Sequence, residues 1–546
     1  LENIHKMSFT EIESIVRRIR KEREDFQIIL EKIDDKLKYI DTSIKEVLEK
    51  EYMLQSKYKV SLGYGIRSLR SISTFDWENI FESISMIEKV YRKDPLEIYE
   101  KMDLDSKRYY RYETKILAEK FNVKEIFLAN KVLEFAKEEY HNGARDKKAH
   151  IGYYLIDKGR KKLFEFFGEN KDSSLYLKKY SYYYLPIVLL SVLVSLGISI
   201  FTLKMPLFFL LIFIPILSIF INIFNHFYLK HFKPKILPKM DFSDGVPEEY
   251  STMVVIPTLL TDENRVEELM KNLEVYYLSN RDENIYFGIV GDFKDGDEKS
   301  TKEDKKIIDK GLECIEKLNA KYGENRFYYF HRERSFSKTQ KKYMGWERKR
   351  GALVEFNALL LGEETSFNII SGDISNLQEK IKYIITLDAD TILPRDEGKR
   401  LIGTIAHPLN RALVNQEKNI VVEGYGIIQP RVLVDMESNN KSTFTRIFAG
   451  SGGIDPYSTA VSDIYQDLFG EGIFTGKGIY DLEVFHKVLG NRLPENAILS
   501  HDLLESSYIR AALATDINLV DGYPEKYSSY IMRNHRWTRG DWQLIK

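Results

Sequence analysis

Two stretches near the middle of the chain are rich in apolar residues and carry no formal charge. They run over Leu185–Leu203 and Met205–Leu229, and only Lys204 separates them. A membrane-spanning helix needs about 20 mainly apolar residues, and each stretch meets that length. Two buried core helices are the alternative, but adjacent runs this long exceed what a soluble core usually requires. The pattern therefore predicts a two-helix transmembrane hairpin over residues 181–230.

Lysines flank both ends of this hairpin, at Lys178, Lys179, Lys230, Lys233, Lys235 and Lys239. Cytoplasmic loops of membrane proteins carry an excess of Lys and Arg. We therefore expect both ends in the cytoplasm and the chain in the cytoplasmic (inner) membrane as a multi-pass protein. The lipid bilayer is then a predicted partner, and the parts before and after the hairpin, including any catalytic domain, are predicted to be cytoplasmic.

The region before the hairpin, residues 1–180, has helical periodicity. Apolar residues from Ile12 to Leu48 recur at spacings of three, four and seven, which predicts one long amphipathic helix or two. Ser8 and Glu11 have the spacing of a capping box at its start. Further amphipathic segments are predicted at Trp77–Arg92, Ser106–Phe121 and Val123–Tyr140, with Asp94-Pro95 as a breaker. We interpret this region as an all-α packing and assembly module.

After the hairpin the pattern changes to short apolar strands that alternate with helices. Residues 231–250 are predicted to be a linker and 251–546 a domain. Strands that alternate with helices predict an α/β fold with a mostly parallel sheet, whose ligands bind beyond the carboxyl ends of its strands. The predicted strands are Thr252–Pro257, Asn284–Val290, Arg326–Phe330 and Tyr383–Leu387, and the helices are Glu263–Leu278, Lys305–Tyr322 and Gly351–Leu361.

Composition excludes several classes of function. The 81 Lys and Arg residues balance 82 Asp and Glu residues, so a global basic field for nucleic acid is absent and we expect no nucleic-acid partner. A single cysteine, Cys314, allows no intramolecular disulfide and no cysteine-rich metal site. Because the chain begins at Leu1 rather than Met, we expect it to be a piece of something longer.

Acidic residues follow two of the predicted strands. Asp388 and Asp390 leave the fourth strand, and Asp292 ends the second. Two aspartates one residue apart can share Mg²⁺ or Mn²⁺ with a diphosphate, although such pairs are often only caps or turns. The aspartyl-phosphate phosphatase pattern DxDx[TV] is a further alternative, and it fails here at Ile392.

Two more groups of residues carry candidate chemistry. Asp502 lies at the start of a predicted helix with Leu503, Leu504, Ile509 and Leu513 on its apolar face, so it is either an N-cap or a general base. The pair His501-Asp502 also occurs in metal-dependent phosphohydrolases, but no other histidine cluster supports that. The stretch RNHRWTRGDW, residues 533–542, combines arginines that suit a diphosphate with tryptophans that suit a sugar face. A packed cation–π helix is its structural alternative.

Together these elements resemble inverting membrane glycosyltransferases of the GT-A type, with their DxD, acidic and QxxRW motifs. The resemblance is closest to the glycosyltransferase module of cyclic β-1,2-glucan synthases. It rests on stretches such as LDADTILPRD (387–396), EGYGIIQPRV (423–432), SDIYQDLFGEGIFTGKGIYD (462–481), RLPENAILSHDLLE (492–505) and RNHRWTRGDWQ (533–543). Two features depart from the family: Arg533 stands where the motif has Gln, and the later membrane spans and phosphorylase-like domain of full-length members are missing.

The resemblance implies a GT-A-like mixed or parallel sheet and transfer of glucose from UDP-glucose to a growing β-glucan acceptor. It implies Asp388 and Asp390 as ligands of Mg²⁺ or Mn²⁺ on the donor, and Asp502 as general base. Arg348, Lys349 and Arg350 could reach the donor diphosphate, and we favour Arg350. The remaining implied contacts are Asp292 to uracil, Arg536 to the diphosphate, and Trp537 and Gln429 to the acceptor. Two alternative functions remain. The chain could belong to another processive β-glycan synthase, or it could be a non-catalytic membrane-anchored scaffold with a degenerate transferase fold.

Overall fold

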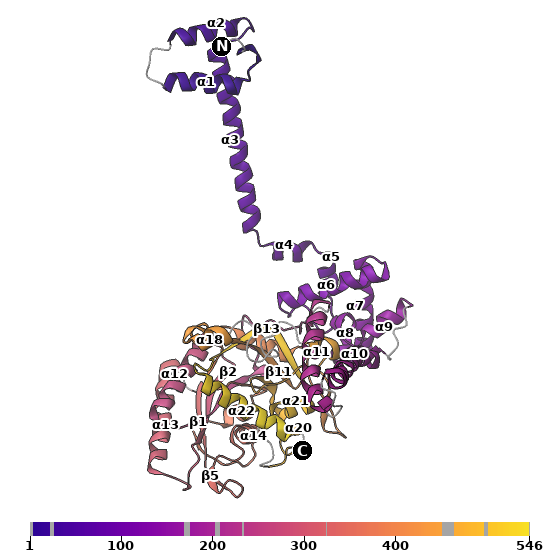
Figure 1. The fold of residues 1–546 in the computed structure, drawn as a ribbon, viewed down its shortest axis with the longest axis vertical. Helices are drawn as coiled ribbons and strands as arrows, with labels where there is room; N and C mark the ends of the chain where they lie inside the picture. The colour runs from indigo at the N-terminus through magenta and orange to yellow at the C-terminus, as the bar shows by residue number, and fades with distance from the viewer. Residues whose placement is uncertain are drawn as a thin grey trace. The chain divides into compact units, whose positions relative to one another are not determined.

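The computed structural model of the chain describes residues 4–21, 27–168, 175–202, 208–231, 234–323, 325–449, 464–495 and 501–544. The chain forms two compact units, Leu1–Glu88 and Lys89–Lys546, and Figure 1 shows their secondary structure. The division falls inside the helical region that the sequence predicts for residues 1–180. The second unit therefore contains helices of that region together with the apolar hairpin and the sheet.

The first unit is built from α1 (Phe9–Lys21), α2 (Gln27–Lys38), α3 (Ile44–Thr74) and α4 (Trp77–Ile84). The apolar positions continue the helical pattern, but the backbone breaks before Ser43, which caps α3 by accepting a hydrogen bond from the Glu46 amide. The prediction of one or two helices up to Leu48 is therefore wrong, since three helices share those positions. The capping box is confirmed: Ser8 N donates to Glu11 Oε2 at 2.8 Å and Glu11 N to Ser8 Oγ at 3.3 Å.

The small core of the first unit lies among α1, α2 and the first turns of α3. Successive turns of these helices bury aliphatic side chains against each other, which is the outcome expected of an amphipathic stripe. The second half of α3 instead leaves most of its apolar side chains exposed. The buried residues are Ile4, Ile12, Val16, Ile33, Leu37, Ile44, Val47 and Leu48.

The helical part of the second unit is organised around a buried aspartate. Asp94, predicted as a breaker, is 3% exposed and accepts hydrogen bonds from the amides of Ile98 and Ile151 and contacts His150 Nδ1 at 2.8 Å. On the other side of the ring, His150 Nε2 lies 2.9 Å from the Tyr110 hydroxyl. The helices of this part are α6 (Leu104–Phe121), α7 (Glu125–His141), α8 (Ile151–Ile156) and α9 (Arg160–Phe166), and the boundary between the two units falls within α5 (Met86–Tyr91).

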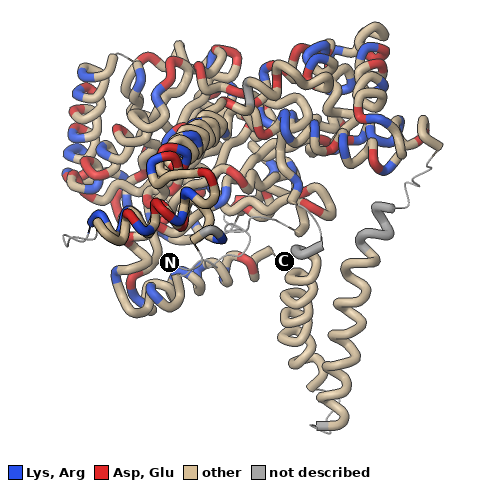
Figure 2. Tube along the Cα trace, turned by 90° about the horizontal axis from the view of Figure 1, so that it is seen from above, with Lys and Arg blue, Asp and Glu red and all other residues tan. Residues whose placement is uncertain are grey.

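Two apolar helices follow, α10 (Leu175–Gly197), with a π-helical extension at Ile198–Thr202, and α11 (Phe209–His231). Ser181–Phe201 and Phe209–Tyr228 are long and apolar enough to cross a membrane. In Figure 2 they run side by side as tan tubes without the blue and red of charged residues. Near their flanking ends, Tyr183 packs on α19 (Ile464–Phe469). The predicted hairpin is thus present as two helices, and its junction lies outside the described residues.

A nine-stranded mixed sheet forms the core of the second unit, in the order β6-β3-β2-β1-β7-β12-β11-β13-β8. Its centre is parallel: β1 (Thr252–Leu260) pairs in parallel with β2 (Ile285–Phe293) and β7 (Tyr383–Thr386), and β2 pairs in parallel with β3 (Phe327–Arg332). The helices α12 (Glu263–Ser279), α13 (Lys302–Tyr322) and α14 (Arg348–Leu360) connect these strands. All of these elements lie within a few residues of their predicted positions, because their local periodicity is strong.

The other half of the sheet is decided by long-range pairing. β11 (Ile427–Val434) lies parallel to β13 (Ala511–Asp521) and antiparallel to β12 (Gly478–Asp481), which also pairs with β7. The helix that contains Asp502 is α21 (Asp502–Ile509). The prediction that Leu513 belongs to its apolar face is therefore wrong, because Leu513 lies in β13. The remaining short strands are β4 (Ser335–Ser337), β5 (Lys342–Met344), β6 (Phe367–Ile370), β8 (Thr391–Ile392), β9 (Leu413–Asn415) and β10 (Ile420–Glu423).

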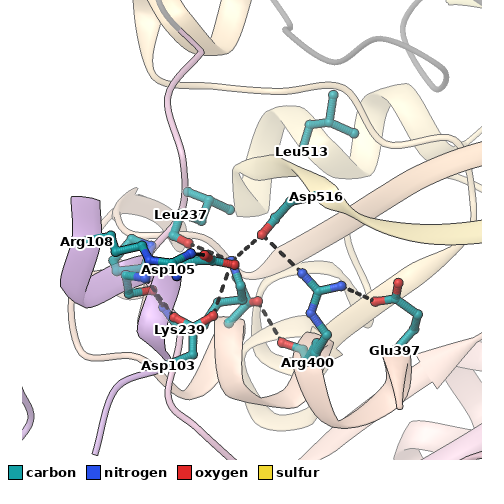
Figure 3. Close-up of polar contacts among 12 residues, drawn as sticks. Asp103, Asp105, Arg108, Leu237, Lys239, Glu397, Arg400, Leu513 and Asp516 are labelled. Carbon is teal, nitrogen blue, oxygen red and sulfur yellow. Dashed lines mark hydrogen bonds and ion pairs between the residues drawn. The ribbon is translucent and has the colours of Figure 1, made fainter. Parts of the chain in front are cut away.

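A buried lysine joins the helical part of this unit to the sheet. Lys239 is 1% exposed, and its ammonium lies 2.5 Å from Asp516 Oδ2 and 4.0 Å from Asp103 Oδ2. Figure 3 shows this cluster, in which Arg400 of α16 (Glu397–Ala406) also reaches Asp516, at 3.3 Å. Backbone hydrogen bonds tie the Lys239 segment to Asp103 on one side and Gly403 on the other. The α6 start and the sheet are therefore held at a defined spacing.

Candidate functional site

The carboxyl ends of the central parallel strands meet at one edge of the sheet. In register, Leu259 of β1 lies opposite Asp292 of β2, and Val255 of β1 lies opposite Thr386 of β7. Asp388 and Asp390 continue beyond β7 and so lie at the level of Asp292, across β1. The sequence prediction that these three acids share one edge is consistent with this register.

Asp388 is held between two lysines. Its Oδ1 accepts a hydrogen bond from Lys349 Nζ at 2.5 Å, and its Oδ2 lies 3.3 Å from Lys477 Nζ. Burial by itself would raise the pKa of Asp388, but the two ammonium groups outweigh it and lower that pKa. Lys477 also pairs with Asp521 at the end of β13, whose other oxygen accepts from Thr391 Oγ1 at 2.7 Å. The result is a chain of alternating charges along the edge.

Sequence reasoning did not identify Lys477 and Asp521 as site residues. Lys477 belongs to the stretch FTGKG (474–478), between two glycines that both have positive φ, +89° at Gly476 and +149° at Gly478. Gly-Lys-Gly before a strand is the signal that could have indicated a backbone built for close approach. Asp521 carries no such local signal, because its place depends on the pairing of β13.

The loop at Gly476 connects Asp388 to Asp502. Lys349 Nζ donates to the Gly476 carbonyl at 3.0 Å as well as to Asp388. A Cβ added to Gly476 would lie only 3.0 Å from Asp502 Oδ1 and 3.2 Å from its Cγ. Asp502 therefore packs directly on this loop, whose Gly476 carbonyl shares the Lys349 ammonium with Asp388.

Asp502 is the first residue of α21 and not its cap. His501 occupies the N-cap position and makes no side-chain capping hydrogen bond. His501 Nε2 lies 3.4 Å from Asp502 Oδ1 and 4.0 Å from Glu505 Oε1. Glu505 is 4% exposed, and burial together with the Asp502 charge raises its pKa to about 7, against the effect of His501. Asp502 is half-buried and is not the N-cap residue of α21, and its role as a general base stays a prediction.

The three basic residues at the start of α14, Arg348, Lys349 and Arg350, point toward different partners. Lys349 reaches the acidic site, whereas Arg350 is buried and its Nη2 lies 2.8 Å from Glu347 Oε2. Arg348 points elsewhere and bonds Asp295 at 2.8 Å. Of the three candidates, the structure places Lys349 beside Asp388 and turns the favoured Arg350 toward Glu347. The charge of Arg350 also acts on Glu505, one turn after Asp502, and its contact with the donor diphosphate stays a prediction.

Asp292 is engaged by a buried arginine. Arg332 Nε donates to its Oδ1 at 2.8 Å and Nη2 to its Oδ2 at 2.6 Å. Burial raises the pKa of Asp292 in spite of this guanidinium. Gly345 lies so close that a Cβ there would be 2.6 Å from the Asp292 carboxylate. A nucleobase that bound to Asp292 would therefore share a carboxylate that already accepts two hydrogen bonds from Arg332.

The other predicted contacts lie around the same loop and on the last helix. Gln429 is 1% exposed, and its Oε1 accepts from the amide and hydroxyl of Thr475, at 2.5 Å and 3.1 Å. Gln429 therefore supports the loop before Lys477. Arg536 and Trp537 lie on α22 (Tyr527–Gln543) with exposed side chains, Trp537 being 40% exposed. The structure leaves their predicted roles open to test.

The acidic pair offers the kind of oxygen atoms that divalent cations bind. Asp390 is exposed, and carboxylate oxygens are the ligands that Mg²⁺ and Mn²⁺ prefer. Each Asp388 oxygen contacts one lysine, which leaves about half of the four lone-pair positions of an ionised carboxylate. A metal bound to Asp388 and Asp390 would therefore lie beside two ammonium groups.

The fold and the site define an α/β domain whose ligand site, rich in carboxylates and ammonium groups, lies beyond the carboxyl ends of its parallel strands. Over 557 aligned residues the chain is 36% identical to the cyclic β-(1,2)-glucan synthase NdvB of Rhizobium meliloti (strain 1021). The match covers 98% of this chain, and the chain spans about a fifth (20%) of that relative. No protein-family model matches the chain. The similarity extends over the helical parts as well as the sheet, and it supports the resemblance to a glycosyltransferase family.

Proposed function

We propose that this chain is the glucosyltransferase part of a β-1,2-glucan synthase, using UDP-glucose as donor and the growing glucan as acceptor. The observation that carries the proposal is the convergence of Asp388 and Asp502 on Lys349 and the Gly476 loop. A GT-A-like transferase needs a site for the donor diphosphate and a base for the acceptor within one small space. The similarity to a cyclic β-(1,2)-glucan synthase supports the choice of product.

In the proposed reaction the acceptor hydroxyl oxygen attacks the anomeric carbon of the donor glucose. The bond from that carbon to the diphosphate breaks, UDP leaves with the electron pair, and configuration inverts. Asp502 takes the proton of the attacking hydroxyl as general base. Lys349 and Lys477 stabilise the negative charge that develops on the leaving diphosphate. A divalent cation held by Asp388 and Asp390 would supply further neutralisation of that charge when bound.

The remaining roles are proposals of the same kind. Asp292, oriented by Arg332, accepts from the uracil edge through a lone pair that the guanidinium leaves open. Arg536 contacts the diphosphate, and Trp537 stacks on the acceptor sugar. Gln429 acts on the acceptor through the Thr475 loop that it holds. The two apolar helices cross the cytoplasmic membrane, so that the site faces the cytosolic UDP-glucose pool and the product forms beside the bilayer.

Membranes that contain the full chain test the proposal directly. We expect incubation with UDP-glucose and Mg²⁺ or Mn²⁺ to yield β-1,2-linked glucan, identified by linkage analysis, and EDTA to abolish synthesis. Another linkage would favour a different processive β-glycan synthase. A folded chain that neither binds UDP nor transfers glucose would favour the non-catalytic scaffold.

Asp502→Asn separates catalysis from binding. Loss of a positioned base typically costs about 10²–10⁴-fold in rate, whereas UDP binding should persist because Asp388, Lys349 and Asp292 are unchanged. Asp309→Asn, on the exposed face of α13, makes the same chemical change away from the site and should keep the normal rate. Near-normal turnover by Asp502→Asn would remove Asp502 from the mechanism.

A further inference from the structure

The second half of α3 carries an apolar surface that its own unit does not cover. The helices α1 and α2 pack on the first turns of α3, and Figure 1 shows α3 continuing beyond them. From Tyr52 to Trp77, every residue except Gln55 and Gly63 is exposed. A large exposed apolar surface of this kind marks an interaction site for a protein or a membrane.

Six of the exposed apolar side chains form one stripe along the helix. Their spacings are four, four, four, three and three residues, an average of 3.6, so the stripe follows one side of the helix without drifting around it. At a rise of about 1.5 Å per residue, the stripe is about 27 Å long. A straight stripe suits a flat partner surface. Its residues are Leu54, Tyr58, Leu62, Ile66, Leu69 and Ile72.

The charge of this segment has one sign. Residues 52–75 contain four basic residues, Lys57, Lys59, Arg67 and Arg70, and no Asp or Glu, in a chain with 81 basic and 82 acidic residues. Lys59 precedes Ile66 by seven residues and Arg70 follows it by four, so both border the apolar stripe. A partner that covers the stripe therefore meets positive charge along its edge.

Local sequence alone favours this helix only weakly. Gly63 and Gly65 lie in its interior, and a Cβ added at either would meet no atom within 4 Å, so close packing does not require glycine there. Glycine destabilises a helix interior, and most helices in proteins gain their stability from burial of an apolar face. A partner that buries the stripe would supply that stability.

We propose that the stripe of α3 lies on the surface of an anionic lipid bilayer, with Lys59 and Arg70 at the phosphate groups of the lipids. Helices that lie in a membrane interface combine an apolar face with Lys and Arg on the polar side. Basic residues near a membrane surface are attracted by anionic lipids. The inference is independent of the proposed transferase activity.

Two observations favour a bilayer over a second copy of the chain. Two copies of this segment would bring only like charges together, whereas paired helices are normally joined by opposite charges beside the apolar seam. A bilayer is also within reach of the chain through α10 and α11, which contain stretches long and apolar enough to cross one.

The experiment reports the surroundings of the stripe in the full chain. In a Cys314→Ser background, Leu69→Cys places a label on the stripe, and Ser71→Cys places it about 160° away around the helix. Each cysteine carries a fluorophore that lipids with brominated acyl chains quench on contact. We expect strong quenching at position 69 in vesicles of phosphatidylcholine with phosphatidylglycerol, and weaker quenching there in phosphatidylcholine alone. Position 71 should show little quenching in either.

Removal of charge tests the role of the lipid phosphates. At the salt concentration that leaves wild-type α3 half docked on anionic vesicles, Lys59→Gln with Arg70→Gln should lower the docking equilibrium about 30-fold, since each basic residue contributes about fivefold. Arg18→Gln with Arg20→Gln is the matched control. It removes two exposed charges from α1, whose apolar side chains pack in the core of the unit, and should keep the wild-type equilibrium.

Three results would overturn the proposal. A label at position 69 that stays in water shows that nothing covers the stripe. A label shielded from water without lipid quenching shows that protein covers it, a second copy if the shielding grows with chain concentration and the same chain if it does not. Quenching that is equal at positions 69 and 71, or that ignores lipid charge, excludes an oriented anionic contact. The transferase proposal is tested separately, by UDP binding and glucose transfer.

Discussion

Gly476 allows one substitution to test the geometry of the site against backbone strain. Its φ is +89°, a region that costs a non-glycine residue about 1–2 kcal/mol. Alanine at this position would in addition place its Cβ 3.0 Å from Asp502 Oδ1. Ordinary contacts begin near 3.4 Å, so Asp502 or the loop must move by several tenths of an ångström.

Gly362 is a matched control for the strain. Its φ is +81°, and a Cβ added there would meet no atom within 4 Å. Gly362→Ala therefore carries the conformational cost alone, about 1 kcal/mol after the gain from a stiffer unfolded chain. We expect both variants to lower the melting temperature by a similar small amount, with Gly476→Ala slightly lower because of the added contact.

Transferase rates should differ strongly between the two variants. Displacement of a catalytic group by about 1 Å can cost about 10²-fold in rate, so a shift of several tenths should cost Gly476→Ala roughly 10-fold. Gly362→Ala should keep the wild-type rate. Both rates are measured as glucose transfer from UDP-glucose at a temperature well below either melting point. Equal rates in the two variants would refute the close packing of the loop on Asp502.

Three further predictions follow from the structure. The pKa of Glu505 is raised to about 7, which means that folding favours its protonated form, so native stability falls as pH rises from about 4.5 to about 7. The melting temperature of Glu505→Gln should therefore exceed that of wild type by an amount that grows across that interval. A difference in melting temperature that is independent of pH would contradict this. Asp94→Ala leaves buried donors unpaired and should cost about 3 kcal/mol, seen as a lower melting temperature; a change below about 1 kcal/mol would argue against the network. In a Cys314→Ser background, cysteines at Glu165 and Ser243 should react with an impermeant maleimide only from the cytoplasmic face; labelling from opposite faces would exclude a hairpin.

Local pattern determined much of this protein before any tertiary contact was known. The strands β1 and β2 and the helices α12 and α13 follow from short-range periodicity, and the capping box at Ser8 follows from residues three apart. The apolar helices are evident from length and lack of charge. Asp388 could be placed at a strand end because it directly follows a buried apolar run.

Tertiary structure alone decided the strands that join the second half of the sheet. The segment Ala511–Asp521 begins Ala-Ala-Leu-Ala, residues with high helix propensity, and it forms β13 because it pairs with β11, more than 80 positions earlier. That pairing carries Asp521 to Lys477 and Thr391. No local pattern contains a contact between residues this far apart in the chain.

The sequence also could not predict toward which partner each charged side chain points. Lys349 and Arg350 are neighbours of like charge, so spacing cannot tell which one faces Asp388. The turn into α14, with positive φ at Glu347 and Arg348, sets the helical phase and turns Lys349 to the site. The raised pKa of Glu505 has the same origin, since burial and the nearby Asp502 exist only once α21 packs on the sheet. Residue types and their order thus indicated the chemistry, and long-range packing decided which groups meet.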